Sequence, residues 1–171
     1  MNSLLVTYIL QTEKWTSPEL FETKNRIYTF LNPVSYLIAL ENKSLFEQFD
    51  GIFADGSLLV SAIRLVYGKR VTRRSFDMTS LAPELLNYLM ESRKTLYIVA
   101  SGQEQVECSV RIFQEQYPKL RIAGFRNGYF SSDAEMNKEA SHIVELNPDF
   151  LIVGMGALMQ EKFLLKVKKM G

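Results

Sequence analysis

Two apolar stretches constrain the fold of this chain more than any other feature of its sequence. TLYIVA (95–100) and DFLIV (149–153) are apolar at nearly every position instead of alternating with polar residues. Short apolar runs of this kind, followed by small residues, indicate strands that end in a turn. Strands that are apolar on both faces belong to sheets that helices cover on both sides, and such sheets are mostly parallel. A mostly parallel sheet with helices on both faces is therefore predicted.

The rest of the chain alternates between strand-like and helix-like patterns. Further strands are predicted at 26–32, 51–55 and 120–125, and helices at 33–46, 58–66, 80–91, 106–117, 136–143 and 158–169. Strands that alternate with helices indicate βαβ units and the α/β class. No linker or repeat divides the 171 residues, so a single domain, 1–171, is expected.

Composition excludes several classes of protein. Hydrophobic residues make up 47% of the chain and charged residues 23%, which argues against disorder. A net charge of +1 gives no reason to expect a nucleic-acid partner. The single cysteine, Cys108, has no partner for an internal disulfide, and its apolar neighbours at helical spacing predict a core position. With no basic leader and no run of about 18 apolar residues, the expected location is the cytoplasm.

Small or polar residues follow every predicted strand. They are Asn32, Asp55, Ser101–Gly102, Asn127–Gly128 and Gly154–Gly156. In open α/β sheets, ligands bind in the crevice beyond the carboxyl ends of the strands. These positions therefore predict a ligand site at that edge of the sheet.

Asp55 allows two interpretations. Its place between a strand and a helix suits an N-cap or turn residue, because aspartate accepts hydrogen bonds from the first helical N–H groups. The same place presents a carboxylate at the edge of the sheet, where it could act as a general base. Gly56, the next residue, would keep the approach to that carboxylate open.

The segment GMGALMQEKF (154–163) places Gly154 and Gly156 between a strand and a helix. This is the beginning of a dinucleotide fingerprint, but Met159 stands at the third glycine position, so NAD is a weak alternative. The two glycines would still let the backbone approach a phosphate-bearing ligand. Gln160 and Glu161, which follow in the first helical turn, either point into the same crevice or are ordinary helix-start residues.

Two further segments have both a structural and a functional interpretation. FRNGYF (125–130) contains Asn-Gly, a common hairpin turn, but Asn127 and Tyr129 could also offer an amide and a stacking face to a nucleobase. GKRVTRR (68–74) is either a solvated loop or a loop that holds a diphosphate. His142 has no partner at metal-ligand spacing, and no Asp-x-Asp follows a strand, so no metal and no other cofactor is expected.

The order of these pieces resembles that of one enzyme family. The pieces are FLNPVSYLIA, FADGSLLV, RRSFDMTSLAPEL, LYIVASG, YPKLRIAGFRNGYF and NPDFLIVGMGALMQEKF, which together cover residues 26–165. The ordered set resembles the WecG/TagA/CpsF family of bacterial glycosyltransferases, glycosyltransferase family 26. The resemblance implies a Rossmann-like fold.

The resemblance also implies a reaction and its substrates. Enzymes of this family transfer a hexose, typically of the N-acetylmannosamine type, from a UDP-sugar to a sugar on an undecaprenyl-diphosphate carrier. They act at the cytoplasmic face of the membrane in the synthesis of teichoic acid or other surface polysaccharide. The displacement inverts the anomeric centre and requires a base to remove the proton of the acceptor hydroxyl. The family is not known to need a metal. A homo-oligomer is compatible with the sequence.

The family's functional residues match individual positions of this sequence. The resemblance implies that Asp55 is the base, that Gln160 lies near the reacting centre, that Tyr129 lies near the nucleotide, and that Arg73 matches the family arginine, with Arg74 one place away. With these, the residues expected to contact substrate are Asn32, Gly56, Arg73, Ser101, Gly102, Asn127, Gly128, Tyr129, Gly154, Gly156 and Glu161.

The sequence departs from the family pattern at several positions. Phe30 replaces a common threonine, Ser75-Phe76 replaces a glycine-containing pair, and Ala157-Leu158-Met159 replaces a small residue followed by Pro-Lys. These departures bear on the donor sugar more than on the reaction type. Family members also continue beyond the point that matches Gly171, so the chain is expected to lack a C-terminal appendage and to be weakly active or inactive without it.

Two rival functions remain open from the sequence. One is an NAD(P)-dependent Rossmann-like oxidoreductase, which would gain thermal stability from NAD and none from UDP. The other is a non-catalytic partner subunit that keeps the fold and works only beside another chain.

Overall fold

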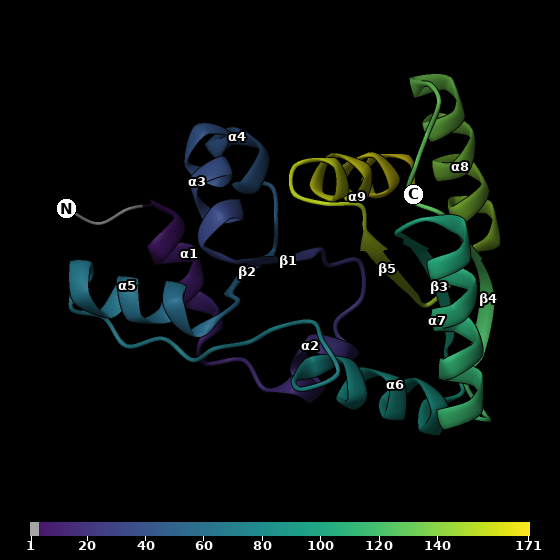
Figure 1. Ribbon diagram of the computed structural model, residues 1–171, viewed down its shortest axis with the longest axis horizontal. Helices are drawn as coiled ribbons and strands as arrows, with labels where there is room; N and C mark the ends of the chain where they lie inside the picture. The colour runs from purple at the N-terminus through teal and green to yellow at the C-terminus, as the bar shows by residue number, and fades with distance from the viewer. Residues whose placement is uncertain (1–3) are drawn as a thin grey trace. The chain divides into compact units, whose positions relative to one another are not determined.

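The structure of the protein, a computed structural model, describes residues 4–171 (Figure 1). The chain divides into two compact units, of which the first ends at Leu85 and the second runs from Leu86 to Gly171. Parallel strands flanked by helices occur in both units, which confirms the predicted α/β class. The strands form two separate sheets, a two-stranded one and a three-stranded one.

The first unit contains the two-stranded sheet. Its elements are α1 (Leu4–Thr12), α2 (Ser17–Glu22), β1 (Tyr28–Leu31), α3 (Pro33–Glu41), α4 (Lys43–Phe46), β2 (Gly51–Ala54), α5 (Ser57–Tyr67) and the first turn of α6 (Leu81–Ser92). β1 and β2 run parallel, with Tyr28 opposite Gly51 and Leu31 opposite Ala54. The helix predicted at 33–46 is divided into α3 and α4 at Asn42, whose side-chain amide donates to the Ile38 carbonyl at 2.8 Å.

Helix α1 was not predicted, although its signal is present in the sequence. Leu5, Val6 and Ile9 recur at helical spacing, and all three are buried. The helix contacts β2, and the Thr12 hydroxyl donates to the Ile52 carbonyl at 3.2 Å. This helix therefore covers the two-stranded sheet.

An aromatic cluster fills part of the first unit. Phe53 of β2 is buried, and its ring lies 5.2 Å from Phe30, 5.8 Å from Tyr28 and 6.5 Å from Trp15, measured between centroids. Phe76 joins the cluster at 5.8 Å from Phe30. Packed aromatic rings contribute beyond the area they bury, so this cluster fixes the strands that lead to Asp55.

The second unit is built on the three-stranded sheet. Its elements are the rest of α6, β3 (Thr95–Ala100), α7 (Gln103–Gln116), β4 (Arg121–Arg126), α8 (Asp133–Leu146), β5 (Phe150–Gly154) and α9 (Met159–Met170). The strand order is β4-β3-β5, and both pairs are parallel. Central β3 is buried on both faces, as predicted, whereas β5 forms an edge of the sheet and is only half-buried.

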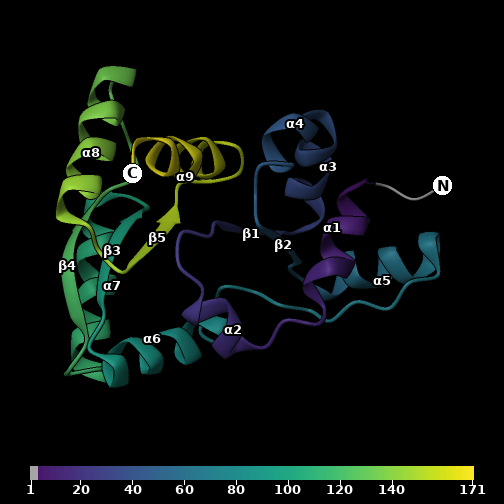
Figure 2. The ribbon, with the colours of Figure 1, turned by 180° about the vertical axis from the view of Figure 1, so that it is seen from behind.

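Helices cover both faces of this sheet. Tyr97 and Val99 of β3 pack in one cluster with Met136 of α8 and Phe163 of α9, so α8 and α9 lie on their face. The chain moves from β3 to β4 through α7, and then back across β3 to β5 through α8. Right-handed crossovers in opposite directions place their helices on opposite faces, which puts α7 on the other side (Figures 1 and 2).

Two further observations complete the fold. Cys108 lies on α7 and is exposed, so its predicted core position is wrong; Val106 and Val110 are the buried residues of that helix. Within residues 4–171, no helix is long and apolar enough to cross a membrane.

Candidate functional site

Asp55 lies at the carboxyl end of β2. Its backbone N–H donates to the Leu31 carbonyl at 2.8 Å, which extends the pairing of β1 and β2 by one residue. Its carboxylate Oδ1 accepts the Ser75 hydroxyl at 2.5 Å. The N-cap of α5 is Gly56, with φ of 89°, and no side chain caps that helix. The N-cap interpretation of Asp55 is therefore wrong, and Ser75 orients the carboxylate instead.

Asn32 follows β1 at the same edge of the two-stranded sheet. Its Oδ1 accepts hydrogen bonds from the backbone N–H groups of Val34 at 3.0 Å and Ser35 at 2.9 Å. These bonds cap α3, whose first residue is Pro33. The structure thus places Asn32 and Asp55 together at adjacent strand ends, as predicted, and uses the Asn32 oxygen for the cap.

The two arginines of the basic loop have different environments. Arg73 is exposed and forms an ion pair with Asp77 at 2.9 Å. Arg74 is half-buried: its Nη1 donates to the Thr12 carbonyl at 3.3 Å, and its guanidinium lies 5.6 Å from the centroid of the Phe53 ring. Arg74 therefore has a structural role in the first unit, and Arg73 has the accessible guanidinium.

In the second unit, the three strand ends are joined through one residue. The Ser101 N–H donates to the Gly154 carbonyl at 3.0 Å, and the Ser101 carbonyl accepts the Gly128 N–H at 2.8 Å. Ser101 has φ of 51°, in the left-handed region that non-glycine residues rarely adopt. Such strain persists where the surroundings fix it, often at functional sites. The predicted meeting of these strand ends is confirmed within this unit.

Two of the predicted glycines fill tight or turning positions. A Cβ on Gly128 would lie 2.9 Å from Cγ of Met155, so a larger residue would require the Met155 side chain or the loop to shift. Gly156 has φ of 87° and open space around it. Asn127 and Gly128 lie in the loop that connects β4 to α8.

The loop after β4 presents Tyr129 to solvent. Asn127 Oδ1 accepts the Tyr129 N–H at 3.0 Å, and Asn127 Nδ2 donates to the Gln103 side chain at 3.0 Å. Gln103 is the first residue of α7, immediately after Gly102. The Asn127 amide therefore ties this loop to the helix that follows β3, and the Tyr129 ring remains exposed.

Arg126, which was not predicted as a site residue, holds the same loop from inside. Its Nε donates to the Asn127 carbonyl at 2.9 Å and its Nη2 to the Tyr129 carbonyl at 2.8 Å. The side chain is only 17% exposed, and its guanidinium lies 4.0 Å from the centroid of the Phe130 ring. No periodicity marks this residue; only its position next to Asn127 could have suggested it.

Two glutamates of α8 hold the Arg126 guanidinium. Glu135 lies 3.1 Å from it and also accepts the Ser131 N–H and hydroxyl, each at 2.6 Å. The Ser131 bonds, followed by Arg126, lower the pKa of Glu135 to about 2. Glu139 lies 3.7 Å from the guanidinium and accepts the Tyr97 hydroxyl at 2.7 Å. Burial and the bond to Glu139 raise the pKa of Tyr97 well above its usual value.

The start of α9 is held by Glu161. Its Oε2 accepts the Leu158 N–H at 2.7 Å, its Oε1 accepts the Gln160 side-chain amide at 3.0 Å, and the residue is fully buried. Leu158 has φ of 74°, which a proline could not adopt. Glu161 therefore matches its helix-start interpretation, and Gln160, half-buried and oriented by Glu161, is the better placed of the two to meet a ligand.

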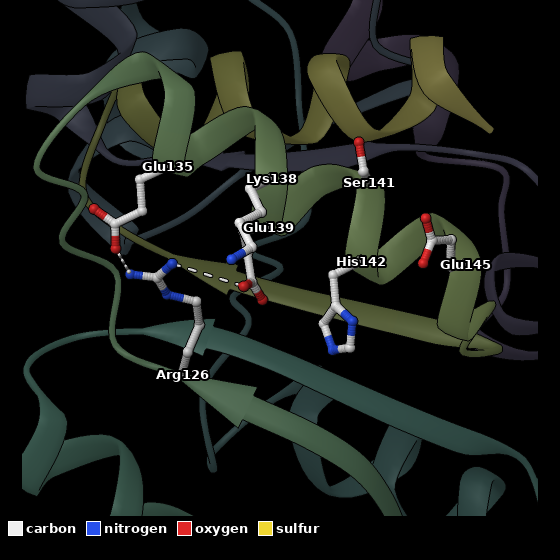
Figure 3. A pocket seen from close by; sticks show the side chains of 7 residues that line it. All are labelled: Arg126, Glu135, Lys138, Glu139, Ser141, His142 and Glu145. Atoms are coloured by element: carbon white, nitrogen blue, oxygen red, sulfur yellow. Dashed lines mark hydrogen bonds and ion pairs between the residues drawn. The ribbon is translucent and has the colours of Figure 1, made fainter.

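A shallow hollow of about 480 Å³ lies between β4 and α8 (Figure 3). Its lining residues are Arg126, Glu135, Lys138, Glu139, Ser141, His142 and Glu145. Figure 3 shows the Arg126 guanidinium directed at both Glu135 and Glu139. Three carboxylates line the hollow and its arginine is already paired, so it does not suit a diphosphate.

Comparison with known proteins identifies the family. The family model described as "Glycosyl transferase WecG/TagA/CpsF family" matches residues 9–170. The chain belongs to this family. The match includes both units, with Asp55 in the first and the Ser101, Gly128 and Gly154 strand ends in the second.

Curated relatives have related names. A UDP-Gal:alpha-D-GlcNAc-diphosphoundecaprenol beta-1,4-galactosyltransferase of Shigella boydii is 31% identical over 83% of this chain and 59% of its own length. An N-acetylglucosaminyldiphosphoundecaprenol N-acetyl-beta-D-mannosaminyltransferase of Bacillus subtilis is 24% identical over 96% of this chain and 62% of its own. One of the same name from Staphylococcus aureus is 25% identical over 84% and 56%. The chain thus spans about three fifths of the length of these relatives.

Proposed function

We propose that the protein is an inverting glycosyltransferase that moves a hexose from a UDP-sugar to a sugar carried on undecaprenyl diphosphate. The observation that carries the proposal is the family match over residues 9–170. The relatives' names support the acceptor, because each contains an N-acetylglucosamine joined to diphosphoundecaprenol. The product would enter cell-surface polysaccharide or teichoic acid synthesis.

The donor sugar is the more variable part of the proposal. The relatives are named for galactose in one case and N-acetylmannosamine in the others. We propose a hexose of the N-acetylmannosamine type or a related one. Three departures from the family pattern lie in the same unit as Asp55: Ser75 donates to its carboxylate, and the ring centroids of Phe30 and Phe76 are 5.8 Å apart in the aromatic cluster. Substitutions at these positions should change donor preference before they change the reaction type.

The proposed mechanism is a single displacement with Asp55 as the general base. The acceptor hydroxyl oxygen attacks the anomeric carbon while its proton passes to the Asp55 carboxylate. The bond from the anomeric carbon to the UDP oxygen breaks, and its electron pair leaves with UDP. Ser75 holds Oδ1 at 2.5 Å, which fixes the carboxylate so that Oδ2 takes the proton.

We propose that the second unit binds the nucleotide. Its strand ends carry glycines, at which the backbone can approach a phosphate-bearing ligand closely, beside Ser101: Gly102, Gly128, Gly154 and Gly156. The exposed Tyr129 ring would stack on the uracil, and the Asn127 amide would lie beside it. Gln160 would contact the sugar near the reacting carbon.

The remaining roles are proposed for the first unit and for the surroundings of the protein. Arg73, exposed at the end of the basic loop, would contact the substrate through its guanidinium. Asn32 and Gly56 would frame the approach to Asp55. We propose that transfer needs no metal, no other cofactor and no nucleic acid, and that the protein works in the cytoplasm at the inner face of the membrane. Activity that persists in EDTA would support the first of these statements.

A ligand-binding experiment separates this function from its rivals. UDP should raise the melting temperature of the chain, and NAD should leave it unchanged. The opposite result would identify an oxidoreductase and refute the proposal. Protection by neither would also count against it.

A rate experiment tests the base. With a panel of UDP-hexoses and a lipid-linked N-acetylglucosamine acceptor, Asp55→Asn should lower UDP release by about 10²- to 10⁴-fold while UDP protection persists. Glu84→Gln, which neutralises an exposed carboxylate on α6 of the same chain, should keep the full rate. A near-normal rate for Asp55→Asn would show that another group takes the proton.

A further inference from the structure

Helix α5 has apolar side chains on two faces. Leu59 and Ile63 are buried in the first unit, but Leu58 is 69% exposed, Leu65 87% and Val66 69%. Leu65 and Val66 follow Leu58 by seven and eight residues, the spacing at which helical residues return to one side of the helix. Single exposed apolar residues are ordinary, whereas three on one stripe of a short helix indicate a surface that something else covers.

The chain around this stripe is basic. Residues 56–76 contain no aspartate or glutamate and five cations, namely Arg64, Lys69, Arg70, Arg73 and Arg74. Arg73 forms an ion pair with Asp77, and Arg74 donates a hydrogen bond to the Thr12 carbonyl. Arg64, Lys69 and Arg70 are exposed and form no salt bridge with any residue between 4 and 171. The whole chain has a net charge of only +1, so this concentration of positive charge is local.

The charge selects among the partners that could cover the stripe. A second copy of this chain, paired through the same face, would bring these three cations against their own counterparts, and like charges at an interface are unfavourable. An anionic lipid surface meets both features at once. Apolar side chains enter the boundary between headgroups and acyl chains, and lysine and arginine lie on the anionic headgroups.

We propose that α5 is a lipid-contact helix, with Leu58, Leu65 and Val66 inserted at an anionic membrane surface and Arg64, Lys69 and Arg70 on its headgroups. The inference rests on the proposed function in one respect, because a polyprenyl-linked acceptor is itself held in a membrane. It goes further by assigning the contact to a particular face of the first unit. α5 begins two residues after Asp55, so the same strand-to-helix turn carries both the proposed base and the proposed lipid contact.

Vesicle flotation of the full chain tests the assignment. The chain should float with vesicles of phosphatidylcholine and phosphatidylglycerol, less with phosphatidylcholine alone, and less at high salt. Leu65→Glu should weaken binding about tenfold or more. Replacing both Lys69 and Arg70 by serine should weaken binding to the anionic vesicles about fivefold for each charge removed. Leu65 is so exposed that its replacement should leave the melting temperature unchanged.

Leu37→Glu is the matched control. Leu37 is 63% exposed on α3, a helix with no basic residue, and its replacement should leave vesicle binding unchanged. Equal losses for Leu37→Glu and Leu65→Glu would overturn the assignment. The assignment would also be overturned if the wild-type chain did not bind the vesicles, or if it formed a dimer in solution through Leu65. Protection by UDP against thermal unfolding, measured on the same samples, tests the proposed function separately. If UDP gives no protection while vesicle binding is normal, the proposed function is refuted and the lipid-contact assignment is not.

Discussion

The loop that carries Tyr129 depends on one arginine, and its removal gives the sharpest test of the second unit. Arg126→Met keeps most of the aliphatic length of the side chain and removes the guanidinium. The change deletes the hydrogen bonds to the Asn127 and Tyr129 carbonyls, at 2.9 and 2.8 Å. It also removes the cation that lies between Glu135 and Glu139.

The contacts of the guanidinium set the size of the effect. Hydrogen bonds from a charged group contribute roughly 1.5 to 3 kcal/mol each, and breaking a buried ion pair costs about 3 to 5 kcal/mol. Glu135 is partly solvated, and Glu139 keeps the Tyr97 hydroxyl, so much of the ion-pair penalty is relieved. We expect a loss of about 3 kcal/mol in the free energy of unfolding, which lowers the melting temperature by roughly 6 to 12 °C for a chain of this size.

Arg121→Met is the matched control. Arg121 lies on the same strand, is exposed, and donates through Nη1 to the Arg93 carbonyl at 3.0 Å. Its replacement should cost less than about 1 kcal/mol. Hydrogen exchange followed by mass spectrometry should show faster exchange at residues 127–131 in Arg126→Met and not in Arg121→Met. Because Tyr129 is the proposed uracil contact, Arg126→Met should also bind UDP more weakly, and Arg126→Lys should restore part of that affinity.

Two results would refute this reasoning. One is a melting temperature for Arg126→Met no lower than that of Arg121→Met. The other is hydrogen exchange that becomes faster throughout the second unit to the same degree as at residues 127–131. General destabilisation would then explain the loss of UDP binding.

Three further predictions concern single side chains. Among the residues described, the Tyr28 hydroxyl is buried without a hydrogen-bond partner, so Tyr28→Phe should raise the free energy of unfolding by about 1 kcal/mol in urea titrations. Leu158→Gly should raise the free energy of unfolding by about 1 kcal/mol in the same assay, because φ of 74° strains leucine. Leu158→Pro should lower the free energy of unfolding by about 3 kcal/mol or more, because proline cannot adopt that angle and lacks the N–H that donates to Glu161. The pKa of Glu135 lies near 2 instead of 4.5, so its contribution is complete above pH 4.5 and disappears as the pH falls to about 2. The difference in melting temperature between wild type and Glu135→Gln should follow that window, and a difference independent of pH would contradict the assignment.

Local patterns predicted the elements well because their causes are local. The apolar run at 95–100 is a buried strand, and the strand ends of the second unit meet as the parallel arrangement requires. Ser75 and Arg126 could not be found in this way, since Ser75 reaches Asp55 across a loop and Arg126 acts through backbone carbonyls that no residue pattern records. Cys108 shows a different limit. Successive residues turn by about 100° around a helix, so Cys108, two residues from both Val106 and Val110, lies on the opposite side of α7 from these buried residues.

The junction at Ser101 determines when this part of the protein is completed during folding. Its N–H is bound by Gly154, which belongs to the last strand of the sheet, so the junction closes a long loop and is expected to form late. β5 is also an edge strand, and edge elements open locally at lower free energy than central ones. The junction should therefore break first in the native state, so that the Ser101 amide exchanges with solvent before the amides in the middle of β3, while the remainder of the sheet stays folded.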